Sequence, residues 1–323
     1  MVKVGLIGCG FMGNMHANCY KNIEGVKLAA VADLRREKAE EIADGAEIYL
    51  DGMDLIKNAD VDVIDICLPT YLHAEYAIAA MDKVKYLFVE KPIALTVDEA
   101  ENMMKKASAV GCNIQIGQVI RFWDEYVALK EMIENGVYGK VVNANFRRIS
   151  PRPNWGWKDW LLDTSLSGGA AQDLHVHDVD YVLSVFGEPK NFASVKNVLG
   201  EKNSYINTLM QYDGFVVGVE GTWDLPSSHP FEATFRVVFE KATVENAGGK
   251  FLAYTEEGVE EIKIEKKELS GVYKGGNISD LGGYYNELIY FTDRVKAGEK
   301  IEKATPADAA KSLAFVLAEI ANA

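Results

Sequence analysis

The sequence is poor in cysteine and in positive charge. Only four of its 323 residues are cysteines, all within the first 112 residues, and none forms a CxxC pair. This spacing argues against a disulfide framework or a zinc ribbon, so we expect free thiols and a cytoplasmic protein. The formal net charge of −14 argues against a nucleic-acid partner, because binding to a phosphate backbone requires clustered lysine and arginine.

Long apolar runs are also missing. No segment approaches the roughly 20 residues that a membrane helix needs, so we expect no membrane partner. The apolar start MVKVGLIG is shorter than a secretory signal and runs into a glycine turn, which indicates a first strand. The composition is that of a globular protein, with 48% hydrophobic and 25% charged residues, and the chain is long enough for two domains.

A glycine-rich turn follows the first predicted strand. Val2–Ile7 is a continuous apolar run, GCGFMG comes next, and the residues after it can form a helix. In this context Gly8 permits a tight turn, Gly10 lets a pyrophosphate approach the main chain, and Gly13 lets the helix pack on the strand. A second strand ends at Asp33, twenty residues after Gly13, where a carboxylate can accept hydrogen bonds from an adenosine ribose. The pattern predicts a dinucleotide site.

Strands and helices then alternate up to residue 121. Apolar runs predict strands at KLAAVAD, VDVIDICLP, YLFVEKP and NIQIGQV, the last of which closes the series. Thr96 and Glu99 form a capping box at the start of one intervening helix. The alternation predicts an α/β domain with a doubly wound parallel sheet, which binds ligands at the carboxyl ends of its strands. The polar residues expected at these ends are Asp33, Pro69, Thr70, Glu90, Lys91 and Arg121.

Beyond residue 121 the pattern changes. One helical stretch is followed by long β-rich segments joined by short polar turns, which predicts an α+β domain with a large, mostly antiparallel open sheet. We expect residues 1–121 to form the dinucleotide-binding domain, with a C-terminal helix at about 288–323 packing back on it, and residues 122–287 to form the second domain. A sheet with helices on one face leaves the other face exposed, so we expect a homodimer or homotetramer formed sheet against sheet.

The stretch SGGAAQDLHVHDVDYVLSVFGEP predicts a helix from about residue 170 to 186. Asp173, His177 and Asp180 fall on one polar stripe between apolar flanks, so we expect the stripe to face a cleft. His175 and His177 point roughly 160° apart on a helix, which argues against a shared metal ion, and we expect no metal. We expect His175 to be a core residue bonded to a carbonyl.

Acid–base chemistry suits this stripe. An imidazole titrates near neutral pH, and a carboxylate one helical turn away can orient it. Asp180 is a candidate supporting group, and Asp178 is expected to be incidental. Lys91 supplies a cation at the end of a nucleotide-domain strand, where it can polarise a carbonyl or hold a hydroxyl. That Lys91 lies near His177 is an inference from topology.

An aromatic segment, RRISPRPNWGWKDW at residues 147–160, precedes this helix. Indole faces can stack on the C–H surface of a polyhydroxylated ring, while arginine and asparagine bind its hydroxyls; equally, the tryptophans can pack the domain junction. We expect at least one tryptophan to be structural. The candidates are Arg147, Arg148, Arg152, Asn154, Trp155, Trp157 and Trp160.

Taken together, GLIGCGFMGNMH, the strand ending at Pro69 with His73 after it, EKPIAL and SGGAAQDLHVHDVD resemble the Gfo/Idh/MocA family of NAD(P)-dependent oxidoreductases. The resemblance extends over nearly the whole chain. It implies hydride transfer between a nicotinamide cofactor and a hydroxyl of a sugar, inositol or related polyol. It also implies that Lys91, Asp173 and His177 are catalytic.

The resemblance implies two sets of binding residues. The cofactor, NAD with NADP not excluded, would contact Gly8, Gly10, Phe11, Met12, Gly13, Asp33, Arg35, Pro69, Thr70, His73, Glu90 and Lys91. The substrate would contact Arg121, Arg152, Asn154, Trp155, Trp160, Asp173, His177 and Tyr284. A carboxylate at Asp33 repels a 2′-phosphate, whereas Arg35 and Arg36 could accommodate one.

Two departures and two rival functions remain. Ala170 and His175 stand where members of the family commonly have glycine, and the bulkier His175 could narrow the pocket. A glycosidase that keeps NAD bound and uses transient oxidation is one rival, which net NADH production separates from a dehydrogenase. A non-catalytic NAD-binding regulator is the other, and the intact set of Lys91, Asp173 and His177 argues against it.

Overall fold

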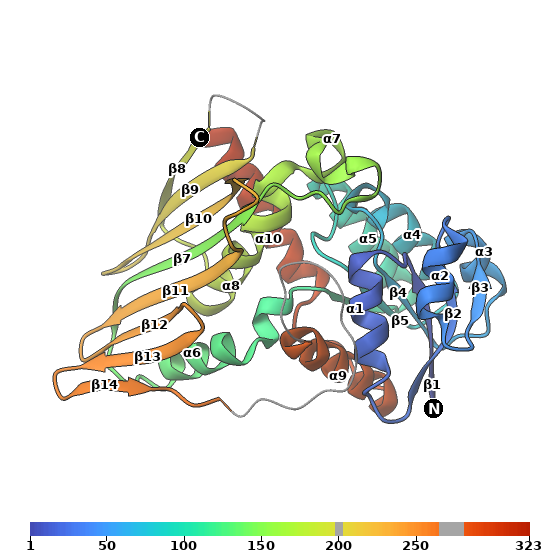
Figure 1. Cartoon of the computed structure of the whole chain (residues 1–323), viewed down its shortest axis with the longest axis horizontal. Coiled ribbons are helices and arrows are strands. Elements are labelled where there is room, and N and C mark those ends of the chain that lie inside the picture. Colours follow the sequence, from blue (N-terminus) through green and yellow to red (C-terminus); the bar gives the residue numbers. More distant parts are fainter. Residues whose placement is uncertain (198–202, 265–280) are drawn as a thin grey trace. The chain divides into compact units, whose positions relative to one another are not determined.

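The structure is a computed structural model that describes residues 1–197, 203–264 and 281–323. These residues form two compact units, each with a sheet of its own (Figure 1). Unit 1 contains residues 1–119 and 281–313, and unit 2 contains the remaining described residues between 120 and 264 together with 314–323. Tyr284 therefore belongs to unit 1, whereas the sequence prediction assigned it to the second domain.

Unit 1 is built on a six-stranded parallel sheet. Its strands are β1 (Val2–Ile7), β2 (Val26–Ala32), β3 (Glu47–Tyr49), β4 (Val63–Ile66), β5 (Tyr86–Val89) and β6 (Asn113–Ile116). They lie in the order β3-β2-β1-β4-β5-β6, all parallel. This order is that of a doubly wound dinucleotide-binding sheet, whose ligand crevice lies where the order reverses, at the carboxyl ends of β1 and β4. The predicted α/β fold is confirmed.

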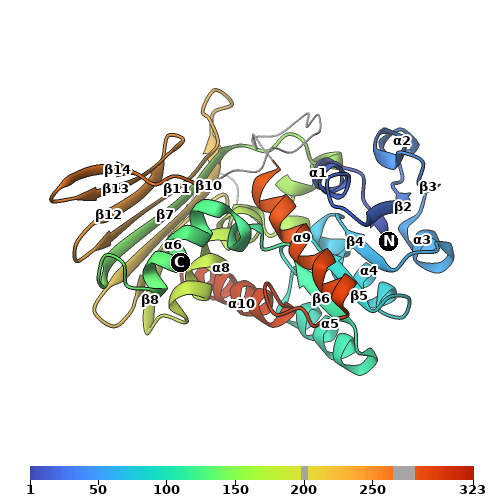
Figure 2. The same ribbon diagram turned by 90° about the horizontal axis from the view of Figure 1, so that it is seen from below.

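Six helices of 7 to 16 residues connect or flank these strands. They are α1 (Phe11–Tyr20), α2 (Arg36–Ala43), α3 (Gly52–Asn58), α4 (His73–Ala80), α5 (Val97–Val110) and α9 (Gly282–Ala297). The predicted capping box opens α5, because Thr96 Oγ1 accepts from the Glu99 N–H and the Glu99 carboxylate accepts from the Thr96 N–H. Helices α1 and α9 lie side by side, and the Tyr285 hydroxyl donates to the Asn22 carbonyl at 3.2 Å (Figures 1 and 2).

Unit 2 contains an eight-stranded sheet in the order β14-β13-β12-β11-β7-β10-β9-β8. Its strands are β7 (Val141–Pro151), β8 (Asn191–Lys196), β9 (Tyr205–Gln211), β10 (Val216–Leu225), β11 (Glu232–Phe239), β12 (Thr243–Ala247), β13 (Lys250–Thr255) and β14 (Gly258–Glu261). Only the β7–β10 pair is parallel, and every other neighbouring pair is antiparallel. The large, mostly antiparallel open sheet predicted for this half is confirmed.

Helices cover one face of this sheet. They include α6 (Asp124–Glu134) and α8 (Val176–Phe186), which lie on the same side of it (Figure 2). Tyr181 of α8 packs its ring 5.6 Å from that of Phe146, and Tyr126 of α6 lies 5.0 Å from Phe235. The sheet residues beneath these helices are buried, as expected for an apolar face packed on a core.

The opposite face of the sheet carries exposed apolar side chains. Residues that pair across strands point to the same face, and residues two apart along a strand do so as well. By this register the following side chains share one face, and each is at least 38% exposed: Val195, Leu209, Val216, Tyr254 and Val259. We call these five residues the open-face set. An apolar set of this kind on a solvent-facing sheet is typical of an interaction surface.

The last helix, α10 (Pro306–Asn322), contains the boundary between the two units. All four cysteines are free thiols. Among the described residues, no helix combines the length and the apolar character that crossing a membrane requires.

Candidate active site

The three glycines after β1 have the geometry that the motif predicts. Gly8 has a φ of +95°, a positive value that residues other than glycine rarely adopt. A Cβ on Gly13 would lie 1.9 Å from the Gly8 carbonyl oxygen, so α1 can approach β1 only with glycine there. A Cβ on Gly10 would meet no described atom closer than 4.0 Å. The main chain at Gly10 is therefore open to a ligand, at the N-terminus of α1, where Phe11 and Met12 begin the helix.

Asp33 is held beside this turn by four hydrogen-bond donors. Its carboxylate accepts the Cys9 N–H at 2.9 Å, the Arg35 main-chain N–H at 2.8 Å, and the Arg35 Nε and Nη2 groups at 3.0 Å each. Burial alone would raise the pKa of Asp33, but the hydrogen bonds from Arg35 and Cys9 lower it below its usual value. Asp33 is therefore a carboxylate, and the Arg35 guanidinium is engaged with it rather than with a separate anion site.

Thr70 lies in the connection after β4, and His73 begins the helix α4 that follows it. Thr70 is 2% exposed, and its hydroxyl has no hydrogen-bond partner among the described residues. Both ring nitrogens of His73 lie 2.8 Å from main-chain carbonyl oxygens, those of Pro92 and Leu68. Because neither nitrogen is available, the His73 side chain joins the loop after β4 to the loop after β5, and a ligand contact from its ring nitrogens is not supported.

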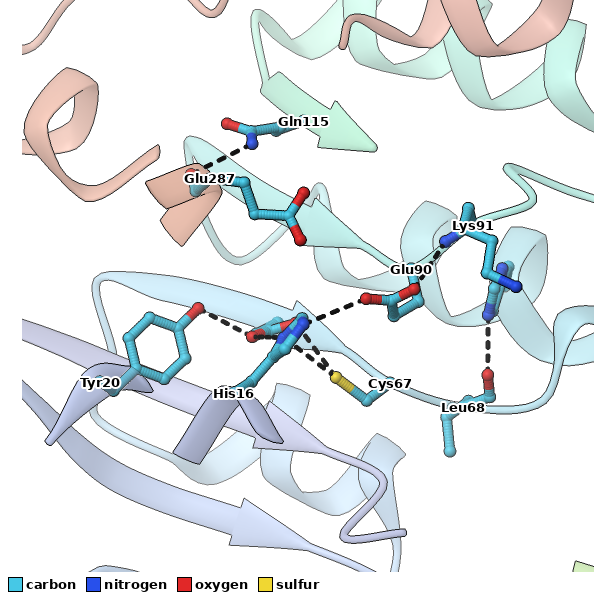
Figure 3. A network of polar contacts seen from close by, with 10 residues as sticks. His16, Tyr20, Cys67, Leu68, Glu90, Lys91, Gln115 and Glu287 are labelled. Atoms are coloured by element: carbon cyan, nitrogen blue, oxygen red, sulfur yellow. Dashed lines mark hydrogen bonds and ion pairs between the residues drawn. The ribbon is translucent and has the colours of Figure 1, made fainter. Parts of the chain in front are cut away.

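A buried polar cluster lies behind these loops, and the sequence reasoning missed most of it. Figure 3 shows His16 of α1, Glu90, the residue after β5, and Glu287 of α9 converging. His16 Nδ1 lies 2.8 Å from Asp65 Oδ2, and its Nε2 makes an ion-pair contact of 3.1 Å with Glu90 Oε1. Tyr20 donates to the same Asp65 oxygen at 2.7 Å. A carboxylate inside the apolar run VDVIDICLP was the available signal.

Burial shifts the proton equilibria of this cluster. Burial would lower the pKa of His16, but the Asp65 carboxylate raises it well above its usual value, so the ring is an imidazolium. The pKa of Glu287 is raised well above its usual range by burial and then by the charge of Glu90. Glu287 is fully buried, and neither of its side-chain oxygens has a hydrogen-bond partner among the described residues.

Lys91 follows this cluster directly. Its main-chain N–H donates to Glu90 Oε2 at 3.1 Å, and a cis peptide bond joins it to Pro92 (Figure 3). Tyr284, expected near the substrate, is a buried residue of unit 1 whose ring lies 6.5 Å from that of His16. The predicted cofactor residues and Tyr284 thus all belong to unit 1.

The predicted catalytic helix of unit 2 is interrupted. Residues Ala171–His175 form a π-turn, and the regular helix α8 begins only at Val176. The helix expected at about residues 170–186 is therefore present, but its first turn is π-helical and not regular α-helix. Asp173 lies within the π-turn and His177, 9% exposed, in the first turn of α8. Wide turns of this kind occur frequently at functional sites.

His175 is a core residue, but its partner differs from the one expected. Its Nε2 lies 3.2 Å from the Glu319 carboxylate rather than from a carbonyl, and both side chains are fully buried. A Cβ on Gly221 of β10 would lie 2.6 Å from His175 Cβ, so this histidine packs directly on the sheet. The larger residue at 175 is thus accommodated by a glycine opposite it.

Two aspartates of α8 also differ from prediction. Asp180 is 1% exposed and receives two hydrogen bonds from Arg121, at 2.6 and 2.8 Å. Asp178, expected to be incidental, is fully buried and bonded to Arg148 Nε at 2.7 Å. These pairs show that the polar side of the helix faces arginines of its own unit. The expected cleft-facing stripe does not extend to Asp180.

The aromatic segment is only partly available to a ligand. Arg152, Asn154 and Trp155 are exposed, and Trp160 is half-buried. Arg148 is paired inside the core, and Arg147 pairs with Glu220 at 3.0 Å on the open side of the sheet. Neither arginine therefore joins the predicted sugar platform. Trp157 is covered by the Lys158 ammonium at 4.4 Å.

Comparison with known proteins connects these observations. Residues 2–118 match the family model described as an oxidoreductase family with an NAD-binding Rossmann fold, and residues 126–245 match the GFO/IDH/MocA C-terminal domain. The chain belongs to the Gfo/Idh/MocA oxidoreductase family. This confirms the resemblance inferred from the motifs and identifies unit 1 as an NAD-binding Rossmann unit.

Curated relatives of this oxidoreductase include inositol dehydrogenases. Myo-inositol 2-dehydrogenase of Thermotoga maritima is 31% identical over 192 residues, which cover 58% of this chain and 55% of that protein. Inositol 2-dehydrogenase of Salmonella typhimurium is 28% identical over 216 residues, covering 64% and 61%. The matched region thus spans between about half and three fifths of the length of these relatives.

Solved structures of similar fold cover the whole oxidoreductase. Levoglucosan dehydrogenase in complex with NADH and levoglucosan superposes with a TM-score of 0.84 at 21% identity, covering 99% of this chain and 96% of that one. Apo scyllo-inositol dehydrogenase from Lactobacillus casei gives 0.79 at 20% identity, covering 100% and 96%. At these identities the similarity establishes the fold.

The Rossmann unit of this oxidoreductase fits its cofactor. The open main chain at Gly10 can approach a pyrophosphate, and the fixed Asp33 carboxylate can accept from ribose hydroxyls. The buried Thr70 hydroxyl, left without a protein partner, is the kind of group that a ligand satisfies. Residues from three strand ends therefore form a coherent set for a dinucleotide.

Proposed function

We propose that this protein is an NAD-dependent dehydrogenase that oxidises a hydroxyl group of a sugar, an inositol or a related polyol. The observation that carries the proposal is the glycine turn after β1 with the Asp33 carboxylate fixed beside it, in a chain of an NAD-binding oxidoreductase family. The inositol and levoglucosan dehydrogenases among its relatives and structural neighbours support the substrate class.

NAD is the preferred cofactor in this proposal. Asp33 is an ionised carboxylate at the ribose position of the motif, and a negative charge there repels a 2′-phosphate. Arg35 could favour NADP, but its guanidinium is engaged by Asp33 through two hydrogen bonds. The cofactor, when bound, supplies the hydride acceptor.

Three side chains divide the remaining chemistry. Lys91 holds the reacting hydroxyl, and His177 removes its proton as the carbon–hydrogen bond breaks. Asp173 orients the His177 imidazole or a neighbouring substrate hydroxyl. Arg152, Asn154, Trp155 and Trp160 contribute polar and stacking contacts to the ring of the substrate. His73, in contrast, supports the cofactor loops through its two carbonyl contacts.

A screen of sugars and inositols for the reduction of NAD and NADP tests this function. With a substrate in hand, Lys91→Ala and His177→Ala should each lower kcat/KM at least about 100-fold, the usual contribution of positioned acid–base groups. Lys105→Ala and His229→Ala are matched controls, since both side chains are at surface positions in ion pairs, and they should retain activity. Undiminished oxidation by Lys91→Ala and His177→Ala would reject the catalytic roles of these two residues. Glycoside cleavage without net NADH production would indicate the NAD-retaining glycosidase instead.

We also propose that the protein assembles as a homodimer or homotetramer through the open face of its unit 2 sheet, and that it works in the cytoplasm. The open-face set supports the assembly, because five apolar side chains share one uncovered face of a regular sheet. The four free thiols support a reducing compartment.

A further inference from the structure

The buried cluster beside Lys91 combines groups from five elements of unit 1. Asp65 and Cys67 come from β4 and the residue after it, and Glu90 from the end of β5. The other members with ionisable or amide side chains are His16, Cys19 and Tyr20 of α1, Gln115 of β6, and Glu287 of α9. Only Glu90 among these residues belongs to the cofactor contacts that the family resemblance implies. The cluster therefore needs a separate explanation.

The charges of this cluster do not balance if every carboxyl group is ionised. The His16 imidazolium lies between Asp65, at 2.8 Å, and Glu90, at 3.1 Å, so its single charge is shared by two carboxylates. Glu287 adds a third carboxyl group, with an oxygen within 4.8 Å of His16 and Glu90. An unpaired, ionised carboxylate buried at this depth is strongly disfavoured, whereas a protonated one is neutral.

The neighbouring hydroxyl and thiol groups do not supply the missing positive charge. Tyr20 is fully buried and Cys67 is partly buried, and burial raises the pKa of each well above its usual value, so both stay protonated and neutral. Burial likewise raises the pKa of Cys19 to about 12. The proton that neutralises Glu287 therefore resides on Glu287 itself, beside the Glu90 carboxylate (Figure 3).

We propose that Glu287 and His16 are positioning residues for Lys91, acting through Glu90. The His16 imidazolium orients the Glu90 carboxylate through their 3.1 Å ion-pair contact, and a protonated Glu287, packed within 4.8 Å of Glu90, keeps it in place without adding a second negative charge. Its other oxygen, Oε2, accepts the Lys91 main-chain N–H at 3.1 Å and so fixes the residue that carries the reacting ammonium. The role at Lys91 rests on the dehydrogenase function proposed above, whereas the protonation of Glu287 does not.

Infrared difference spectroscopy tests the protonation without any need for turnover. The spectrum of wild type minus Glu287→Gln at neutral pH should contain the C=O stretch of a carboxylic acid, shifted in D2O. Glu101→Gln, at an exposed glutamate paired with Lys105, is the control and should lack that band. Absence of an acid band from the wild type minus Glu287→Gln spectrum would overturn the proposal. Binding of one metal ion per chain that is lost in Glu287→Gln would also overturn it, since a cation would then neutralise these carboxylates.

Kinetics test the positioning. Glu287→Gln keeps the size and a donor group and should leave kcat within about threefold, whereas Glu287→Leu and His16→Leu should lower kcat about 10- to 100-fold through misplacement of Lys91. The Kd for NAD should change little in all three variants. A fall in kcat with an unchanged Kd for NAD distinguishes misplacement of Lys91 from a loss of folded protein, which would lower both activity and NAD binding. An active wild type with an unchanged kcat in Glu287→Leu would refute the positioning role while the dehydrogenase function stands. Absence of turnover in the wild type would instead reject the proposed function.

Discussion

Glu287 gives the protein a pH dependence of stability that can be worked out from its burial. The folded state keeps the proton of this carboxyl well above the usual pKa of 4.5, while the unfolded chain releases it. A group with a raised pKa in the folded state contributes stability below its unfolded pKa, and this contribution is lost as the pH rises toward the folded pKa. Because of this residue, the free energy of unfolding is therefore lower at neutral pH than it would be at a pH below the unfolded pKa.

Glu287→Gln should consequently stabilise the protein at pH 7. The variant needs no proton uptake, so its free energy of unfolding should exceed that of wild type at neutral pH, and the gain should disappear near pH 4. Urea unfolding of both proteins across this range measures the difference. A gain independent of pH would show that packing, and not the proton, distinguishes the two side chains.

Among single residues, those that could be predicted from the sequence are the ones whose partners lie close by in the chain. Gly8, Gly10 and Gly13 act within one turn, and their spacing alone predicts their geometry. His16 and Asp65 meet across 49 positions of the chain, and His175 meets Glu319 across 144. No local pattern specifies such pairs, which explains why the cluster around His16 was missed and why His175 was assigned the wrong partner.

At the scale of elements, Gly13 and Gly10 should respond differently to the same substitution. Gly13→Ala would place a methyl group 1.9 Å from the Gly8 carbonyl oxygen, so α1 must move away from β1, which lowers both the Tm and the affinity for NAD. Gly10→Ala would place a methyl group no closer than 4.0 Å to another residue and should keep the Tm while weakening NAD binding. Thermal unfolding and NAD titration separate the two effects. Equal Tm losses in both variants would contradict the assigned roles.

The attachment of α8 to its sheet provides a second prediction. Asp178→Asn removes the carboxylate that Arg148 of β7 contacts at 2.7 Å inside the core, and loss of one partner of a buried pair costs about 3–5 kcal/mol. Asp213→Asn, which removes a partner of Lys190 at the surface, should cost at most about 1 kcal/mol. Denaturant unfolding measures both. Similar small losses would mean that the Arg148 pair does not secure the helix.

Elements were predictable where apolar periodicity is strong. Five strands of unit 1 coincide with apolar runs, whereas β3 has only three residues, Glu47–Tyr49, which is too short for a pattern to emerge. The π-turn at Ala171–His175 was missed for a different reason. A wheel drawn at 3.6 residues per turn assumes a regular helix, and the packing of His175 against Gly221 is visible only in three dimensions.

For the whole molecule, the two sheets and their classes followed from the change of pattern near residue 121, whereas the chain's return path did not. Helix α9 belongs to unit 1, and the last ten residues belong to unit 2. These C-terminal segments are amphipathic helices, and amphipathicity shows that a helix packs on something without showing which sheet it covers. Contacts such as Tyr285 with Asn22 and Phe315 with Phe192 decide this.

The open face of unit 2 yields the last prediction, which concerns assembly. Val195→Lys with Leu209→Lys places two charges on β8 and β9, at one end of the open-face set, where the two side chains are 62% and 56% exposed. If this face joins two copies of the chain, the charges should shift the sedimenting species from an oligomer to a monomer. The free energy of unfolding of the monomer should fall by no more than about 1 kcal/mol, since neither side chain is buried within the chain. Val110→Lys, at a 44% exposed valine at the end of α5 in unit 1, is the matched control. An oligomer that persists in the double variant, or a wild type that sediments as a monomer, would place the function of this apolar face elsewhere than in self-association.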